Sequence, residues 1–177
     1  MRANWFLAVD NSGISGHGVF ATRDIQSGSL IHRMNGKRAS LLQCVAAIAK
    51  GSLNIDDPLQ ISRFGYIVLD EFSNRFNHSC EPNAALVNEA DLVTVKPIAA
   101  GDEITFDYSL TVKHAFYTAF WRMPCRCGKA SCRGEIGDIA SVPERVIDLN
   151  VKRGTLQAYI LSTISAYRAP ISESAAQ

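Results

Sequence analysis

The sequence predicts a β-rich α+β domain followed by a helical C-terminal extension. Short runs of β-branched, aliphatic and aromatic residues recur between residues 5 and 108, and turn formers separate them. One helical pattern interrupts these runs after Ser40, and a second apolar stripe of helical spacing follows Gly154. Strands and helices that are segregated in this way indicate an α+β domain rather than a wound parallel sheet.

The strand pattern begins near the N-terminus and ends before residue 109. Strands are expected at 5–9, 19–21, 30–31, 66–69, 84–87, 92–95 and 103–108. The strands 84–87 and 92–95 should form a hairpin, because turn formers join them. Gly16 and Gly18 lie beside the second strand, where glycine indicates either a turn with positive φ or the close approach of another group to the backbone.

The helical patterns lie in two places. Ser40 is a good N-cap and Gly51 a good C-terminal stop, and the apolar pattern between them should bury Cys44. A short helix is expected at 143–149, and a longer one carries the stripe Leu156, Tyr159, Ile160, Thr163, Ile164 and Tyr167. The stripe should pack either against the domain or against a second subunit, which makes the C-terminal helix a candidate oligomer interface.

The composition is that of an ordinary globular protein. Its 177 residues fit one domain with a small appendage, and 20% of them are charged while 47% are hydrophobic. A formal net charge of +1 gives no reason to expect a nucleic-acid surface. No apolar run approaches the roughly 20 residues of a membrane-spanning helix, and the N-terminal run is too short for a signal peptide. We therefore expect an intracellular protein, cytoplasmic or nuclear, that contacts neither membranes nor nucleic acid directly.

The five cysteines predict a metal site. An odd number in an intracellular chain argues against a disulfide framework. Cys125, Cys127 and Cys132 lie within eight residues of one another, and Gly128 permits a sharp turn between them. A closed zinc site requires four ligands. We expect Cys80 to be the fourth ligand, because polar residues and a proline turn surround it.

Cys80 has a second interpretation, as a nucleophile activated by His78. The two residues are only two positions apart, whereas cysteine hydrolases usually bring such a pair together through the fold. A zinc-bound thiolate would also be unable to attack a substrate. The metal site is therefore the preferred interpretation, and a Cys–His hydrolase is the less favoured one.

Four segments carry motifs that can be compared with known families. They are Gly16–Ala21 (GHGVFA), Asn77–Asn83 (NHSCEPN), Gly101–Tyr108 (GDEITFDY) and Cys125–Gly134 (CRCGKASCRG). In this order they resemble the motifs of the SET-domain protein-lysine N-methyltransferases, and the last is similar to the cysteine-rich post-SET zinc segment. Their joint occurrence is far more specific than any one of them.

The resemblance implies a SET-domain fold of several small, mostly antiparallel sheets, with a pseudoknot that brings two distant motifs together. It implies a SET domain at residues 1–120, a post-SET zinc-binding segment at 121–137, a helical extension at 138–170 and a flexible tail at 171–177. It also implies that one Zn²⁺ is held by Cys80, Cys125, Cys127 and Cys132.

The activity that the resemblance implies is methyl transfer from S-adenosylmethionine to the lysine ε-amine of a protein or peptide, a histone among the candidates, with S-adenosylhomocysteine as product. Tyr108 would be the catalytic residue, and Phe106 would line the lysine channel. The cofactor would be held by Gly16, His17, Gly18, Arg75, Phe76, Asn77, His78 and Tyr108. Gly18 would let the backbone approach the cofactor closely.

The substrate is less well defined than the reaction. The segment 31–64, where the family has a variable substrate-facing insert, is short and shows no acidic cluster. A non-catalytic SET-like module that binds a lysine-bearing tail is the alternative function. The presence of Tyr108 together with Asn77 and His78 favours the enzyme.

Overall fold

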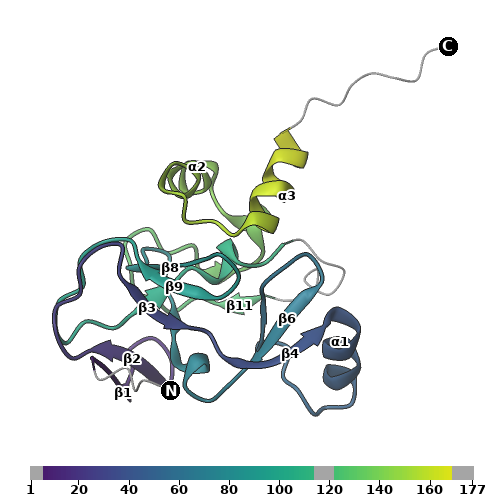
Figure 1. The fold of residues 1–177 in the computed structure, drawn as a ribbon, viewed down its shortest axis with the longest axis horizontal. Helices are drawn as coiled ribbons and strands as arrows, with labels where there is room; N and C mark the ends of the chain where they lie inside the picture. The colour runs from purple at the N-terminus through teal and green to yellow at the C-terminus, as the bar shows by residue number, and fades with distance from the viewer. Residues whose placement is uncertain (1–5, 114–121, 169–177) are drawn as a thin grey trace.

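The computed structural model describes residues 6–113 and 122–168, and in this part of the chain twelve strands form five small sheets (Figure 1). Four of the sheets are antiparallel. β1 (Leu7–Asn11) pairs with β2 (His17–Ala21), and β11 (Met123–Pro124) pairs with β12 (Glu135–Ile136). The two three-stranded sheets have the orders β3-β9-β8 and β4-β6-β5. The β-rich α+β prediction is confirmed.

The three-stranded sheets contain most of the longer strands. In one of them β9 (Asp91–Thr94) lies between β3 (Leu30–Arg33) and β8 (Ala84–Val87), and β8 and β9 form the predicted hairpin. In the other, β6 (Gly65–Leu69) lies between β4 (Gly36–Ser40) and β5 (Pro58–Gln60).

The fifth sheet is a parallel pair of two short strands. β7 (Asn77–His78) lies beside β10 (Thr105–Phe106), with Asn77 opposite Thr105 and His78 opposite Phe106. Asn83 supports the pair, because its side-chain oxygen accepts a hydrogen bond from the Thr105 amide at 2.9 Å. The motifs at 77–83 and 101–108 therefore lie side by side, as the resemblance implies.

α1 (Leu41–Ala49) begins as predicted at Ser40. The Ser40 hydroxyl accepts from the Gln43 amide, and the Gln43 side chain accepts from the Ser40 amide, which together form a capping box. Cys44 is 1% exposed, so its prediction as a buried thiol is confirmed. On the outer side of the same helix, Leu42 remains 80% exposed.

The main hydrophobic core lies between the small sheets of the SET-like region. Its fully buried members are apolar or aromatic, and they lie both on strands (Val19, Ile31 and Leu92) and on the segments between strands (Phe76, Ile98 and Ile104). Tyr108 packs against the edge of this core. The motif residues are thus attached to the best-packed part of the molecule.

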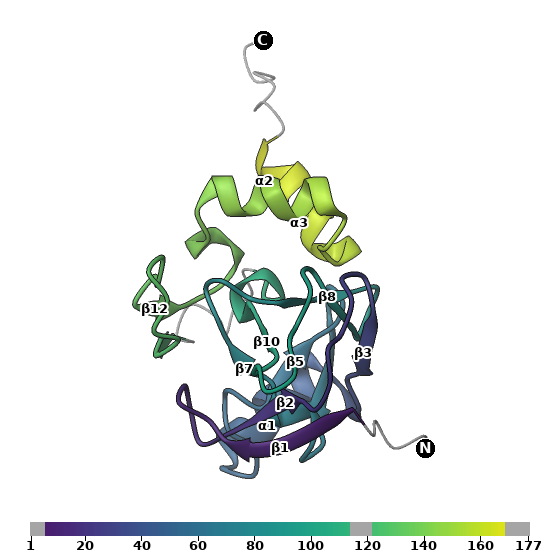
Figure 2. The ribbon, with the colours of Figure 1, turned by 90° about the vertical axis from the view of Figure 1, so that its left-hand side faces the viewer.

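The C-terminal extension forms a second, smaller core. α2 (Glu144–Arg153) and α3 (Ala158–Arg168) lie on one side of the molecule above β8 (Figures 1 and 2). Leu156, Ile160 and Ile164 are buried together with Leu110, so these members of the apolar stripe pack within the chain, and a role of the C-terminal helix in an oligomer interface stays a prediction. The side chain of Tyr167 and the predicted tail at 171–177 lie outside the described residues.

Several elements differ from the sequence prediction. The strand expected at 103–108 spans only Thr105–Phe106, because Asp107 caps the 3₁₀ turn Tyr108–Leu110. The helix expected at 143–149 continues to Arg153 and ends at Gly154, whose φ is +65°. β4 and β5 were not predicted. Of the helices in the described ranges, none is both long and apolar enough to cross a bilayer.

Candidate functional site

Two cavities meet at Tyr108. The larger has a volume of about 390 Å³ and is lined by the N-terminal loop, by β7 and by the cysteine-rich segment. The smaller, of about 50 Å³, is lined mainly by rings and aliphatic side chains, among them Phe76, Phe106 and Leu59. Asp56, Asp57, Asn74 and Tyr108 line both. We call the larger cavity the chamber and the smaller one the channel.

The hydroxyl of Tyr108 is held at this junction by the backbone. It donates a hydrogen bond to the Phe76 carbonyl oxygen at 2.6 Å. The Tyr108 ring lies 4.7 Å from the ring of Phe106, which belongs to the channel. Burial, followed by the nearby carboxylates of Glu103 and Asp56, raises the pKa of Tyr108 well above its usual range. The phenol is therefore protonated at neutral pH.

His78 connects the tyrosine turn to the cysteine cluster. Its Nδ1 accepts from the Tyr108 backbone amide at 3.2 Å, and its Nε2 lies 3.4 Å from the Cys80 sulfur. An unprotonated Nδ1 and a protonated Nε2 satisfy both contacts, which corresponds to the neutral imidazole. Burial lowers the pKa of His78 to about 4, and this favours the same neutral form. His78 also lines the chamber.

The side-chain amide of Asn77 faces the first motif. Its nitrogen lies within hydrogen-bonding distance of the Ser15 and His17 carbonyl oxygens, at 3.2 and 3.1 Å, and of Glu103 Oε1 at 2.7 Å. Ser12 also donates to the Glu103 carboxylate, at 2.8 Å. Asn77 and Glu103 therefore fix the N-terminal loop that forms one wall of the chamber.

The structure places the Glu103 carboxylate next to Gly18, a neighbour that the sequence did not predict. A Cβ atom at this position would lie 2.2 Å from Glu103 Oε1, so the absent side chain makes room for the Glu103 carboxylate. Close approach of Glu103 is thus one reason for a glycine at this position, and close approach of a cofactor to its backbone stays a prediction. Gly16, by contrast, has a φ of +49° and open space around it, as expected of a glycine that is needed for a turn with positive φ.

The remaining predicted cofactor residues surround the chamber without lining it. Gly16, His17, Gly18, Arg75 and Phe76 are absent from the described lining, although Phe76 lines the channel. Arg75 donates to His17 Nδ1 at 3.2 Å and to Glu71 at 3.1 Å. Their direct contact with a cofactor stays a prediction, whereas Asn77, His78 and Tyr108 do lie on the chamber wall.

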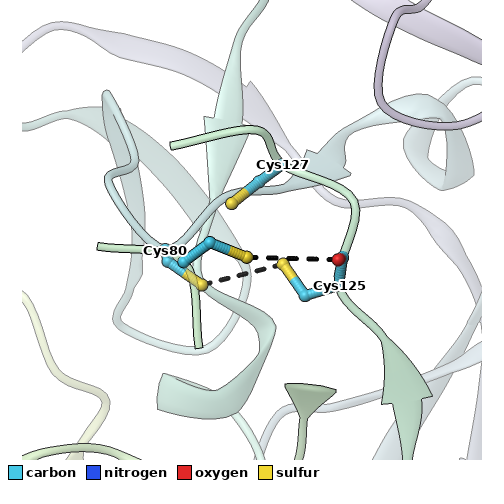
Figure 3. Close-up of side chains that lie close together, drawn as sticks. Cys80, Cys125 and Cys127 are labelled. Atoms are coloured by element: carbon cyan, nitrogen blue, oxygen red, sulfur yellow. Dashed lines mark hydrogen bonds between the residues drawn. The ribbon is translucent and has the colours of Figure 1, made fainter. Parts of the chain in front are cut away.

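The four predicted cysteine ligands come together. The sulfur atoms of Cys80, Cys125, Cys127 and Cys132 all lie within 4.8 Å of one another, and those of Cys80 and Cys125 are 3.7 Å apart. Figure 3 shows Cys80, Cys125 and Cys127 pointing toward a common centre. A tetrahedral zinc with Zn–S bonds of about 2.3 Å would place its sulfurs about 3.8 Å apart. The geometry therefore fits zinc, while Cys44 lies in α1, outside the cluster.

The comparison with known families agrees with this arrangement. The family model for the SET domain matches residues 16–109. The chain belongs to the SET domain family. The match contains the first three motifs and ends just after Tyr108, and the cysteine-rich segment follows it.

Curated SET-domain relatives are similar over most of this chain. Histone-lysine N-methyltransferase ATX2 of Arabidopsis thaliana is 27% identical over an alignment of 172 positions, which covers 86% of this chain and 15% of ATX2. Histone-lysine N-methyltransferase Su(var)3-9 of Drosophila pseudoobscura pseudoobscura is 40% identical over 160 residues, covering 75% of this chain and 25% of the relative. This chain thus spans a quarter or less of the length of either relative.

A solved SET-domain structure shows the same fold. The methyltransferase domain of human histone-lysine N-methyltransferase SETMAR superposes with a TM-score of 0.60 at 18% sequence identity. The superposition covers 75% of this chain and 58% of that domain. At this identity the likeness concerns the fold.

The SET-domain site also contains residues that the sequence motifs do not mark. Asp56 and Asp57 form an acidic pair where the chamber meets the channel, although the segment 31–64 was expected to have no acidic cluster. Arg122 and Arg126 of the cysteine-rich segment also line the chamber, and the guanidinium of Arg122 forms an ion pair with Glu135. The adjacent aspartates are visible in the sequence, but only the fold shows that they reach the tyrosine.

Proposed function

We propose that this chain is an S-adenosylmethionine-dependent protein-lysine N-methyltransferase. The observation that carries the proposal is the position of Tyr108, whose ring lies where a cofactor-sized chamber meets a narrow aromatic channel. A single-pocket binding module has no need of this junction. Two substrates that react with each other do need it, because their reacting atoms have to be aligned.

The chamber is suited to the cofactor by size and position. Its volume of about 390 Å³ falls within the range of small-molecule sites, which is roughly 300–1,000 Å³. S-adenosylmethionine supplies a methyl group on a sulfonium leaving group. The chain itself needs only to orient the two reactants, and we assign Asn77, His78 and the loop at Ser15 to the cofactor.

The channel is suited to a lysine side chain. Its apolar walls, including Phe106 and Phe76, would desolvate the amine and lower its pKa, which exposes the lone pair needed for attack. Asp56 and Asp57 at the entrance would favour the approach of a cationic chain. The protonated Tyr108 hydroxyl and the Phe76 carbonyl would then hold the amine on its path toward the methyl group.

Zinc belongs to the same proposal, as the group that holds the cysteine-rich segment against the chamber. Four sulfur donors at tetrahedral spacing support it. The segment supplies part of the chamber wall through Arg122, Met123 and Arg126. With its thiolate bound to metal, Cys80 would have no role as a nucleophile.

The substrate is proposed from the relatives. ATX2 and Su(var)3-9 carry the name histone-lysine N-methyltransferase, so a histone tail or another lysine-bearing protein inside the cell is the expected substrate. Incubation with radiolabelled S-adenosylmethionine, core histones and a mixed protein extract tests the proposal. Label should appear on lysine in at least one protein. Binding of a lysine-bearing peptide with neither transfer nor cofactor binding by calorimetry would favour the lysine-binding module instead.

A further inference from the structure

A third cavity, of about 280 Å³, is lined in part by Cys80 and shares no lining residue with the chamber. One wall is formed by α2, and the opposite wall by β8 and the residues after β9. Both ribbon views place α2 above β8 (Figures 1 and 2). Because α2 lies beyond residues 16–109, this cavity depends on the C-terminal extension rather than on the SET domain alone.

The α2 wall carries two cations with an apolar residue between them. Arg145, Leu149 and Arg153 follow one another at intervals of four residues, which places them on the same face of the helix, and all three line the cavity. The two arginines are separated by about 12 Å along the helix axis. This face of α2 therefore carries a positively charged side chain at each end and an apolar side chain between them.

The acidic residues that line this cavity already accept hydrogen bonds from other residues of the chain. Glu81 accepts hydrogen bonds from the Ser131 amide at 3.1 Å and from its hydroxyl at 2.7 Å. The Asp107 carboxylate is bound by Arg133. By contrast, no carboxylate in residues 6–113 and 122–168 forms an ion pair with either Arg145 or Arg153. The cavity thus presents positive charge on the α2 side, while on the opposite wall the negative charge of Glu81 partly offsets that of Lys96.

The β8 wall of the cavity includes the small side chain of Ala85, which leaves space between the sheet and α2. Along β8, Ala84, Ala85 and Leu86 all line the cavity, but Ala84 and Leu86 also belong to the main core, whereas Ala85 does not. Side chains alternate between the two faces of a strand, so Ala85 faces α2. A larger residue at this position would fill the space between the sheet and Leu149.

We propose that this cavity binds a small aliphatic dicarboxylate. One carboxylate would bind Arg145 and the other Arg153, because guanidinium and carboxylate groups form paired, charge-assisted hydrogen bonds. The aliphatic chain would lie between Leu149 and Ala85. The volume, close to the roughly 300 Å³ lower limit of small-molecule sites, favours a free small acid over a segment of a protein.

The test is a titration of the complete chain followed by amide resonances in two-dimensional NMR. The probes are octanedioate, the monoacid octanoate and the uncharged octanediol. Octanedioate should shift the amides of β8 and α2 and bind about tenfold more tightly than octanoate, because a second charge-assisted contact is made. Octanediol should cause no saturable shift. Equal affinity for all three probes, or shifts confined to the chamber, would overturn the proposal.

Matched variants locate the binding. Arg145→Gln and Arg153→Gln should each reduce octanedioate to the affinity of octanoate. Lys152→Gln removes the same charge from the same helix outside the cavity lining, so it should bind as the unaltered protein does. Ala85→Leu should block the binding of every probe without changing the charge of the cavity. If this variant does not fold, the two arginine variants alone test the proposal.

A capped acidic peptide separates the free acid from a protein ligand. Acetyl-Glu-Val-Val-Glu-amide carries two carboxylates on a peptide backbone, which the narrow cavity should not admit. It should therefore bind much more weakly than octanedioate. If the peptide binds more tightly and the arginine variants abolish that binding, the small-molecule occupant is wrong. None of these readouts depends on methyl transfer.

Discussion

The guanidinium of Arg133 forms two hydrogen bonds with the carboxylate of Asp107, at 2.8 Å from Nη1 and 2.6 Å from Nη2. Arg133 directly follows Cys132, and Asp107 directly precedes Tyr108. The side chain of Asp107 is 0% exposed and that of Arg133 is 11% exposed, so the pair is buried. The cysteine-rich segment is therefore joined to the tyrosine turn by a buried ion pair as well as through His78.

Replacement of Arg133 should damage both stability and turnover. Arg133→Met leaves the Asp107 carboxylate buried without its cation, which typically costs about 3–5 kcal/mol. Because Asp107 also caps the turn that begins at Tyr108, kcat should fall more than KM rises. Thermal unfolding and steady-state kinetics measure the two effects. Lys129→Met removes a charge from an exposed site in the same segment and should change neither.

The role of Tyr108 is tested by removal of its hydroxyl. Tyr108→Phe should nearly abolish methyl transfer and leave cofactor affinity mostly intact, because the hydroxyl lies at the junction and not inside the chamber alone. Loss of the hydrogen bond to Phe76 should lower the free energy of unfolding by only about 1 kcal/mol. Single-turnover kinetics and calorimetry separate transfer from binding. A variant with unaltered rates would show that the hydroxyl has no part in the reaction.

The cysteine cluster predicts one zinc per chain. Cys132→Ser removes one of the four donors and should lower the metal content and the unfolding temperature together, since metal binding stabilises the folded state. Cys44→Ala removes a buried thiol that lies in α1, outside the cluster, so this variant should retain the metal. Elemental analysis of the purified proteins provides the measurement. Full metal content in Cys132→Ser would contradict the four-ligand site.

Substitution of Gly18 tests whether the nearby Glu103 carboxylate is the reason that position 18 requires a glycine. Gly18→Ala places a methyl group against the Glu103 carboxylate, which is tethered by Asn77 and Ser12 and has little freedom to move. The expected loss is about 1–3 kcal/mol of stability. In a Glu103→Ala background the same substitution should cost much less. An equal cost in both backgrounds would mean that something other than Glu103 occupies the space.

Sequence patterns were most successful where the chemistry is local. The N-cap at Ser40, the hairpin at 84–87 and 91–94 and the clustered cysteines each depend on residues a few positions apart. Cys80 lies with the other three cysteines, where a count of donors had placed it, and its binding of zinc stays a prediction.

Contacts between distant segments were the part that patterns could not supply. Gly18 and Glu103, or Arg133 and Asp107, are ordinary residues until the fold brings them together. β4 and β5 were missed because polar residues occupy much of β4 and proline begins β5. The sequence pattern also did not predict that the strand ends at Phe106. The residues around Asp107 have a β-type pattern, but the Asp107 side chain caps the turn that begins at Tyr108.

The acidic pair at the channel entrance gives a prediction about substrate approach. Asp56→Asn and Asp57→Asn each remove a negative charge where the two cavities meet, so the KM for a lysine-bearing peptide should rise several-fold while cofactor affinity changes less. The effect should shrink as salt is added, since screening weakens the attraction in the unaltered protein too. Asp10→Asn, on an exposed position of β1, is the matched control and should behave as the unaltered protein does. If both aspartate variants retain the original KM at low salt, the pair does not guide the substrate, and the apolar walls around Phe106 are left to select the lysine.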